Sequence, residues 1–250
     1  MKITRIDTIP LALPLKKPMI MAGRSFETLE TVLVRIETEG RLAGWGEASV
    51  APFLTGETGL SIVTTIRILA DALTGTDVRN LGHIVRLISA AVIGNPAAKA
   101  AVEMAAHDAA GRAMNVPLYA LLGGGRVQEI DCLHLVGNGN PDADIAEAEK
   151  KAREGFRAIK YKVANGDLVV EADTLVRLRR ALGPQVMLCA DANGGWSRGD
   201  ASTFVRLADE SMANFLEQPV AADDHDGMAR VARASRIPIA ADESLHGAGD

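Results

Sequence analysis

The sequence predicts an α+β region followed by a TIM-type (β/α) barrel region, of which about five strand–helix units are present. Residues 2–13, 29–39 and 42–48 alternate apolar and polar side chains at a period near two, which is typical of half-buried strands. Residues 60–122 place apolar side chains three and four positions apart, as helices do. After residue 130, strand-like and helix-like segments alternate, which indicates a parallel sheet with crossover helices.

The N-terminal region is predicted to be a small antiparallel meander covered by helices. Two segments, 15–28 and 49–59, interrupt the alternating pattern. We predict that both are loops, and their length favours a functional or lid role. A short helical run then ends at the three glycines 123–125, which mark a boundary. The predicted domains are therefore residues 1–125 and 126–250.

The second domain is built from five predicted strands with helices between them. The strand segments are DCLHLVG (131–137), FRAIKYKV (156–163), VMLCADAN (186–193), ANFLEQP (213–219) and IPIAADES (237–244). The helices between them are predicted over 141–153, 168–182, 200–211 and 224–234.

The composition excludes several classes of function. A net charge of −5, with the 27 basic residues spread along the chain, argues against nucleic acid as a partner. No apolar run approaches the roughly 20 residues that span a bilayer, and the N-terminus lacks the apolar run of a signal peptide. We therefore expect a cytoplasmic protein that does not enter a membrane. Cys132 and Cys189 lie in apolar strand-like segments without a CxxC partner, so we expect two buried thiols.

Three acidic residues stand at the ends of successive predicted strands. Asp191, Glu217 and Asp242 are 26 (191 to 217) and 25 (217 to 242) residues apart, the length of one strand–helix unit. Because parallel strands end at one face, the three carboxylates should converge there and require a cation. Oxygen ligands alone favour Mg²⁺, with Mn²⁺ or Ca²⁺ next. The alternative for any one acid is a solvated or helix-capping role, which three acids in register make less favourable.

Lys160 and Lys162 lie two residues apart on the preceding strand, so their side chains leave the same face. That face could be the solvent side of an amphipathic strand, but parallel strands are normally covered on both faces. At the strand end, a nearby divalent cation, a second ammonium group and partial burial would each lower a lysine pKa, as a general base requires. We therefore predict Lys162 as the catalytic base and Lys160 as its electrostatic partner.

Together these motifs resemble those of the enolase superfamily, and within it the mandelate racemase and muconate lactonizing enzyme family. The sequence KYK at 160–162 matches the KxK motif of the muconate lactonizing subgroup. Asp191, Glu217 and Asp242 match the three metal ligands of the family, and they are carried in DAN, EQP and ADES. The N-terminal region is similar to the capping domain of the family, so the resemblance covers the whole chain.

The resemblance implies a Mg²⁺-dependent isomerase or lyase that acts on a small carboxylate or amino-acid derivative. A substrate carboxylate on the metal would lose its α-proton to Lys162, and the metal would stabilise the resulting enediolate. Lys160 would assist electrostatically. The reaction classes implied are cycloisomerisation, racemisation or epimerisation, and dehydration, and the sequence does not distinguish among them or identify the substrate.

Further site candidates surround these positions. Asn193 and Glu243 adjoin ligand positions and are candidates for supporting the ligands, with a helix-start or surface role as the equal alternative. The two predicted loops would close over the mouth of the barrel and contact the substrate, through Met19, Met21, Arg24 and Phe53. His134 ends the first strand of the barrel region and could reach the substrate, although a packed or solvated histidine is the favoured alternative.

The sequence departs from the family pattern at its end. Members of the family carry another lysine at the end of the sixth barrel strand, opposite the KxK base, and this sequence stops at Asp250, before that strand. We therefore expect that the 250 residues are a truncated or incomplete form of a longer enzyme, or a damaged gene product. The alternative function is an inactive remnant that acts at most as a metal or carboxylate binder. The resemblance also implies a homo-oligomer when the enzyme is complete.

Overall fold

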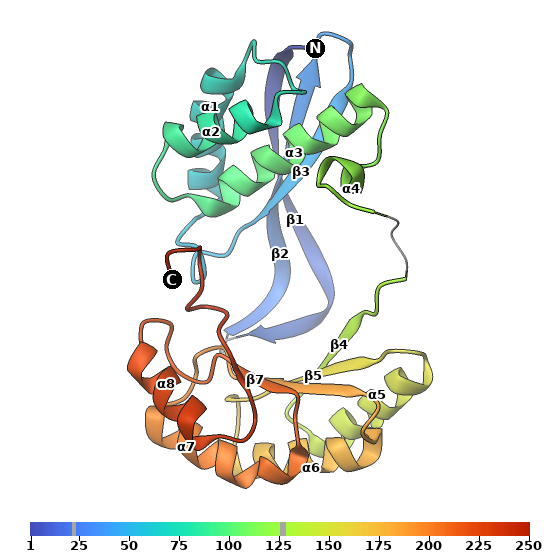
Figure 1. Ribbon diagram of the computed structural model, residues 1–250, viewed down its shortest axis with the longest axis vertical. Helices are drawn as coiled ribbons and strands as arrows, with labels where there is room; N and C mark the ends of the chain where they lie inside the picture. The colour runs from blue at the N-terminus through green and yellow to red at the C-terminus, as the bar shows by residue number, and fades with distance from the viewer. Residues whose placement is uncertain (22–23, 126–128) are drawn as a thin grey trace. The chain divides into compact units, whose positions relative to one another are not determined.

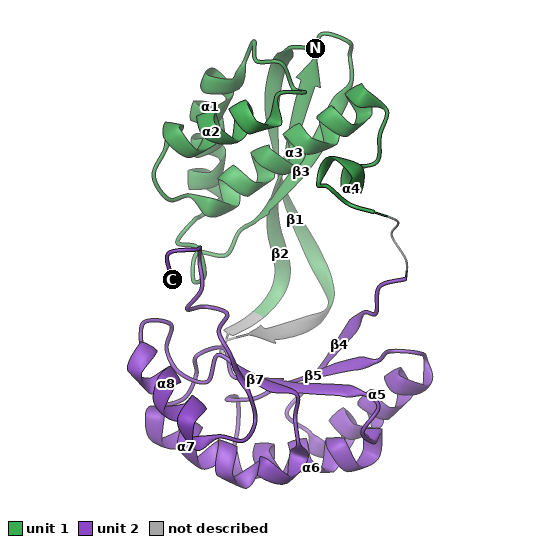
Figure 2. Cartoon of the chain, viewed as in Figure 1, with its two compact units in different colours: residues 1–19, 25–128 green, residues 20–24, 129–250 purple. Residues whose placement is uncertain are grey.

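The fold was analysed in a computed structural model of the chain (Figure 1). The structure describes residues 1–21, 24–125 and 129–250, and it describes no side chains between residues 17 and 25. The chain divides into two compact units (Figure 2). Unit 1 comprises Met1–Met19 and Ser25–Gln128, and unit 2 comprises Ile20–Arg24 and Glu129–Asp250. The boundary that the sequence predicts, between residues 125 and 126, adjoins residues outside the described part.

Unit 1 contains a three-stranded sheet in the order β1-β2-β3. The strands are β1 (Ile3–Met21), β2 (Arg24–Thr38) and β3 (Ala43–Ser49), and β2 pairs antiparallel with β3. The predicted meander is therefore confirmed. The expectation of a loop over residues 15–28 is wrong, because both strands continue into this segment. Residues 15–21 and 24–28 are strands although they lack the apolar alternation by which a strand is recognised in a sequence.

Four helices accompany this sheet: α1 (Gly59–Leu73), α2 (Leu81–Ala91), α3 (Pro96–Met114) and the short α4 (Leu118–Leu121). The predicted loop before α1 is present, and it ends at a capping box in which Thr58 and Ser61 bond reciprocally. Helix α3 packs directly on β3 because Gly44 and Gly46 have no side chains. A Cβ at Gly46 would lie 1.9 Å from the carbonyl oxygen of Ala101. Small residues on both elements therefore bring backbone against backbone.

Unit 2 contains a five-stranded parallel sheet in the order β4-β5-β6-β7-β8, which confirms the five predicted strands. The strands are β4 (Leu133–Val136), β5 (Ala158–Lys162), β6 (Met187–Asp191), β7 (Phe215–Glu217) and β8 (Ile239–Ala240). The helices are α5 (Pro141–Arg153), α6 (Leu168–Leu182), α7 (Arg198–Leu207) and α8 (His225–Ala234), with a 3₁₀ turn at Asp209–Ser211.

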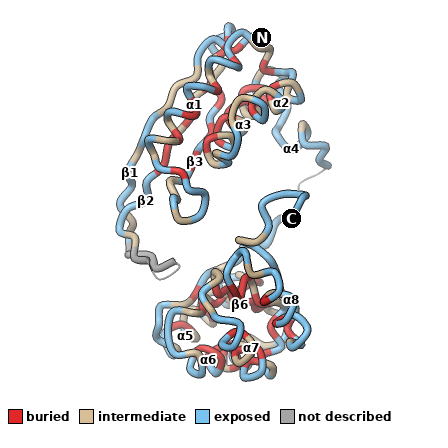
Figure 3. The backbone as a smooth tube through the Cα atoms, turned by 90° about the vertical axis from the view of Figure 1, so that its left-hand side faces the viewer, coloured by how far each residue is buried: buried red, intermediate tan, exposed pale blue. Residues whose placement is uncertain are grey.

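One face of this sheet is covered by the helices of unit 2 (Figure 1). Ile159, Leu188 and Leu216 point to that face and form the buried core with the apolar sides of the helices. Figure 3 shows the concentration of buried residues along β6. Side chains of the opposite parity, including Lys160, leave the other face, as strand alternation requires. The functional candidates of β5, β6 and β7 are therefore separated from the core by the sheet itself.

The structure bears on two expectations from the sequence, the burial of the cysteines and the absence of a membrane-spanning segment. Cys189 is buried as expected, but Cys132 is exposed, because it precedes β4 and lies outside the sheet. Burial raises the pKa of the Cys189 thiol to about 11. Within the part of the chain that the structure describes, no helix is both long and apolar enough to cross a membrane.

Candidate active site

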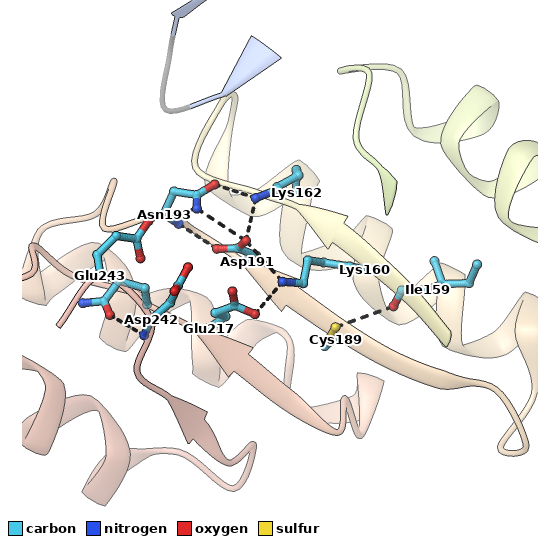
Figure 4. Close-up of polar contacts among 10 residues, drawn as sticks. Ile159, Lys160, Lys162, Cys189, Asp191, Asn193, Glu217, Asp242 and Glu243 are labelled. Carbon is cyan, nitrogen blue, oxygen red and sulfur yellow. Dashed lines mark hydrogen bonds and ion pairs between the residues drawn. The ribbon is translucent and has the colours of Figure 1, made fainter. Parts of the chain in front are cut away.

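The ends of β5, β6 and β7 bring the predicted lysines and two of the predicted acids together. Lys162 is the register partner of Asp191, and Asp191 is the register partner of Glu217. Asp242 follows β8, two residues beyond the end of that strand. The parallel register therefore places the four functional positions along one edge of the sheet (Figure 4).

Each lysine forms an ion pair with a carboxylate of a neighbouring strand. The Nζ atom of Lys160 lies 2.6 Å from Oε2 of Glu217 and 3.6 Å from Oδ2 of Asp191. The Nζ atom of Lys162 lies 2.6 Å from the same Asp191 oxygen. Asp191 is nearly inaccessible, with 2% of its side chain exposed, while the two lysines keep 17% and 20%. Asp191 is thus the buried centre on which both ammonium groups converge.

The pKa of Lys160 is set by burial and by two carboxylates. Burial opposes its charge, but the hydrogen bond that Lys160 donates to Glu217 and the charges of Asp191 and Glu217 outweigh burial, and the pKa of Lys160 rises above its ordinary value. The pKa rises because the ammonium group contacts the carboxylates directly. A charged Lys160 is consistent with the electrostatic role predicted for it, whereas the lowered pKa was predicted for the base, Lys162.

Glu217 is in the opposite situation. Burial raises the pKa of its carboxyl group, and the negative charges of Asp191 and Asp242 raise it further, against the lowering effect of the Lys160 hydrogen bond. The three predicted ligands therefore interact electrostatically. A cluster of carboxylates that repel one another in a partly buried place favours a bound cation.

Asn193 connects the lysine and the acids. Its Oδ1 atom accepts a hydrogen bond of 2.7 Å from Lys162 Nζ, and its Nδ2 atom donates one of 3.0 Å to Glu243. Its backbone N–H also donates to Asp191. The structure thus places Asn193 and Glu243 beside the lysine and the acid, and gives Asn193 direct contact with Lys162 (Figure 4).

Gln218 is a supporting residue that the sequence reasoning missed. It is fully buried, and its Oε1 atom accepts hydrogen bonds from the backbone N–H groups of Asp242 and Ser244. Its Nε2 atom donates to Val220 and to the Ser244 hydroxyl. The signal was present in the EQP motif, in which an amide directly follows a buried strand. Gln218 fixes the segment that carries Asp242.

The remaining candidates lie on other segments of the chain. The side chains of Met19, Met21 and Arg24 lie outside the described residues. Phe53 packs against Phe26 in unit 1, with 5.4 Å between the ring centroids.

The possibility that His134 reaches the substrate is not supported, and the structure agrees with the favoured alternative, a packed histidine. His134 pairs in register with Ile159, so its side chain points to the helix-covered face of the sheet and not to the face of the lysines. Its Nε2 atom bonds to Glu147 of α5, and its ring packs edge-on against Phe156.

The chemistry of the donor set fits a hard divalent cation. Asp191, Glu217 and Asp242 offer only carboxylate oxygens, and Asp191 and Glu217 already share the positive charge of Lys160. Among the described residues, the buried Oε2 atom of Glu243 has no hydrogen-bond partner, which leaves an unsatisfied oxygen beside Asn193. As the described side chains stand, no three Asp, Glu, His or Cys residues form a group that could hold a metal ion. Asp191 and Glu217 are engaged by lysines instead.

Comparison with known proteins shows to which family this chain belongs. Residues 4–123 match the family described as "Mandelate racemase / muconate lactonizing enzyme, N-terminal domain", and residues 143–250 match "Enolase C-terminal domain-like". The L-Ala-D/L-Glu epimerase of Bacillus subtilis is 37% identical over 248 residues, which are 98% of this chain and 68% of the epimerase. This chain belongs to the mandelate racemase/muconate lactonizing enzyme family of the enolase superfamily. It is a racemase- or cycloisomerase-like enzyme.

Other members of the family agree in sequence and in structure. Muconate cycloisomerase 1 of Acinetobacter baylyi is 28% identical over 97% of this chain and 67% of its own length. The structure of a dipeptide epimerase from Cytophaga hutchinsonii, complexed with Mg and the dipeptide D-Ala-L-Val, superposes with a TM-score of 0.88 at 30% identity. That alignment covers 98% of this chain and 66% of the epimerase. This chain thus spans about two thirds of the length of these family members.

Proposed function

We propose that this protein abstracts the proton α to a carboxylate in a small substrate and acts as an epimerase, racemase, cycloisomerase or dehydratase. The observation that carries the proposal is the convergence of Lys160 and Lys162 on Asp191 at the carboxyl ends of parallel strands. Basic side chains and carboxylates that meet at this edge of an α/β sheet form a typical catalytic arrangement. The names of the related epimerases and of the cycloisomerase support this class of reaction.

Lys162 is the proposed base. It stands at the last position of β5, with its amine held by Asp191 and Asn193 and one fifth of its side chain exposed. In its neutral form the amine can accept the substrate α-proton, and the resulting ammonium ion is stabilised by the Asp191 carboxylate. Lys160 remains charged because Glu217 and Asp191 raise its pKa. It therefore contributes a fixed positive charge close to the developing negative charge of the substrate.

Asp191, Glu217 and Asp242 are the proposed ligands of Mg²⁺, with Mn²⁺ as a substitute. When bound, the cation would hold the substrate carboxylate and stabilise the negative charge that proton removal leaves. Asn193 and Glu243 would orient Asp191 and Lys162. Gln218 would keep Asp242 in place through its backbone.

Exchange of the substrate α-proton with deuterium tests the proposal directly. The protein with MgCl₂ in D₂O is incubated with dipeptides, N-acylated amino acids, hydroxyprolines and muconates, and loss of the α-proton signal is followed by NMR. Lys162→Ala should lose the exchange that the wild type shows. Lys151→Ala is the matched control, because Lys151 lies on α5 and its ion pair is with Glu154, which is not one of the site carboxylates. Exchange that is undiminished in Lys162→Ala would refute the assigned base.

A non-catalytic metal or carboxylate binder is the second candidate. The observation in its favour is that, among the ion pairs of the described residues, Lys160 and Lys162 alone approach Asp191 and Glu217. A binder would take up Mg²⁺ in a calorimetric titration and show no α-proton exchange with any member of the panel. Exchange with one member would exclude this candidate.

A further inference from the structure

A buried carboxylate lies beneath the turn that follows Lys162. Glu171 of α6 is 6% exposed, and it accepts hydrogen bonds of 2.9 Å from three consecutive backbone N–H groups. The donors are Ala164, Asn165 and Gly166, which come directly after β5. Three N–H groups that point to one carboxylate define the path of this turn.

This turn adjoins both Lys162 and the loop that contains its hydrogen-bond acceptor, Asn193. It begins two residues after Lys162, and Ala164 has a φ of 63°, a left-handed conformation that the Glu171 hydrogen bonds stabilise. The turn also packs closely against the loop that contains Asn193. A Cβ added at Gly195 of that loop would lie only 2.9 Å from the Cβ of Ala164. The lysine and its acceptor Asn193 thus both rest on the segment that Glu171 holds.

A second buried acid acts in the same manner on the opposite side of Lys162. Asp144 of α5 is fully buried, and its Oδ1 atom accepts from the backbone N–H groups of Gly137 and Asn138. Gly137 has a φ of 136°, and a Cβ there would lie 2.8 Å from the Cβ of Lys162. The backbone of Lys162 is therefore flanked by two turns, each held by a carboxylate from the helix that follows it.

We infer that Glu171 and Asp144 are positioning residues for Lys162, which hold its backbone so that the amine meets Asp191 and Asn193. Neither carboxylate touches Lys162 Nζ in a described hydrogen bond, so both act through main-chain geometry. The inference rests on the proposed function in one respect, namely that Lys162 is the base. A displacement of about 1 Å at a catalytic group is enough to lower a rate by about a hundredfold.

The rival explanation is that these acids only stabilise the fold. A buried carboxylate with three donors contributes to stability wherever it lies, so loss of stability in a variant does not distinguish the two explanations. A matched control resolves this point. Arg179 lies at the other end of the same helix, where it donates to the carbonyl groups of Ser211, Gly183 and Val186. Arg179→Lys removes main-chain hydrogen bonds from α6 without touching the turns beside Lys162.

The test compares Glu171→Gln, Gly137→Ala and Arg179→Lys with the wild type, in the presence of MgCl₂ and below each melting temperature. Glu171→Gln keeps one acceptor oxygen and the shape of the side chain. Gly137→Ala acts from the opposite side and leaves the Glu171 hydrogen bonds intact. The first readout needs no substrate: acetic anhydride labels lysines, and peptide mass spectrometry gives the rate at Lys162 relative to the partly exposed Lys99 of unit 1. The second is kcat and KM for the panel member that exchanges fastest.

We expect the relative labelling rate of Lys162 to rise several-fold in Glu171→Gln and Gly137→Ala, as its amine leaves Asp191 and Asn193, and to stay unchanged in Arg179→Lys. We expect kcat to fall by about tenfold or more in the first two variants, with KM within about twofold. Unchanged labelling and kcat in both variants would overturn the inference, as would an equal change in Arg179→Lys. If exchange survives in Lys162→Ala, the proposed function fails, and the labelling ratio alone decides whether the two acids position Lys162.

Discussion

The Oδ1 atom of Asn193 lies 2.7 Å from the Nζ atom of Lys162, so a side-chain amide in the loop after β6 accepts a hydrogen bond from the amine at the end of β5. Asn193 has a φ of 43°, in the left-handed region that Asn tolerates better than most residues. The hydrogen bond therefore depends on a backbone conformation as well as on a side chain. This relationship gives Lys162 a direction, because Asp191 and Asn193 together occupy two of its three donor positions.

Asn193→Gly should lower the α-proton exchange rate by about tenfold to a hundredfold. Glycine adopts the positive φ without strain, so this variant removes only the side chain. Asn115→Gly is the matched control, since Asn115 also has a positive φ but ends α3 in unit 1. Exchange measured by NMR should stay within about twofold of wild type in the control. Equal rates in the wild type and Asn193→Gly would show that the hydrogen bond has no functional role.

Addition of MgCl₂ should raise the melting temperature of the wild type. A cation that binds only the folded state stabilises it by about 2.7 kcal/mol at a hundredfold excess over Kd. Asp242→Asn removes one proposed ligand and should abolish most of this shift in differential scanning fluorimetry. Asp209→Asn, which alters an acid paired with Arg236 elsewhere in unit 2, should keep the full shift. A shift of the same size in both variants would mean that the cation binds elsewhere.

Glu217→Gln should gain stability relative to the wild type as the pH rises from 4 to 7. The folded-state pKa of Glu217 lies above its ordinary value of 4.5, mainly because of burial. A raised pKa means that the folded wild type loses stability as the pH rises through that pKa, and glutamine does not titrate. Lys160 keeps its charge throughout this range, because its pKa is raised above 10.5. Urea unfolding without divalent cations at several pH values measures the difference, and a gain that shrinks toward pH 7 would contradict the prediction.

Arg179→Lys should lower the free energy of unfolding of unit 2 by about 2–3 kcal/mol, as expected for lost hydrogen bonds from a charged donor. The Arg179 guanidinium donates to four backbone carbonyl groups and to the Asn214 side chain. Lysine has a single amine and cannot reach all of them. Arg180→Lys is the control, because Arg180 makes an exposed pair with Glu210 and should change stability by less than about 0.5 kcal/mol. Chemical denaturation monitored by circular dichroism compares the two variants.

The strands of unit 2 and the acids at their ends were predictable because their signals are local. An apolar run followed by Asp191 or Glu217 identifies a strand and its end without knowledge of neighbouring strands. The first two strands of unit 1 were predicted too short, because strand conformation in residues 15–21 and 24–28 depends on a partner strand. The face of the sheet on which His134 lies was not predictable for a related reason. Its position in the chain shows that it ends a strand, whereas the register with Ile159 decides on which side of the sheet it lies.

The sequence by itself determined the residue types of the site and their order along the chain, through the KYK motif and three acids at the spacing of one strand–helix unit. Only the tertiary structure decided which lysine contacts which carboxylate, and that the pKa of Lys160 is raised. It also revealed Gln218, Glu171 and Asp144, each of which accepts hydrogen bonds from backbone N–H groups. Hydrogen bonds and charge interactions act over a few ångströms in space, and residues 57 positions apart, such as Lys160 and Glu217, reach that distance only when the sheet has formed.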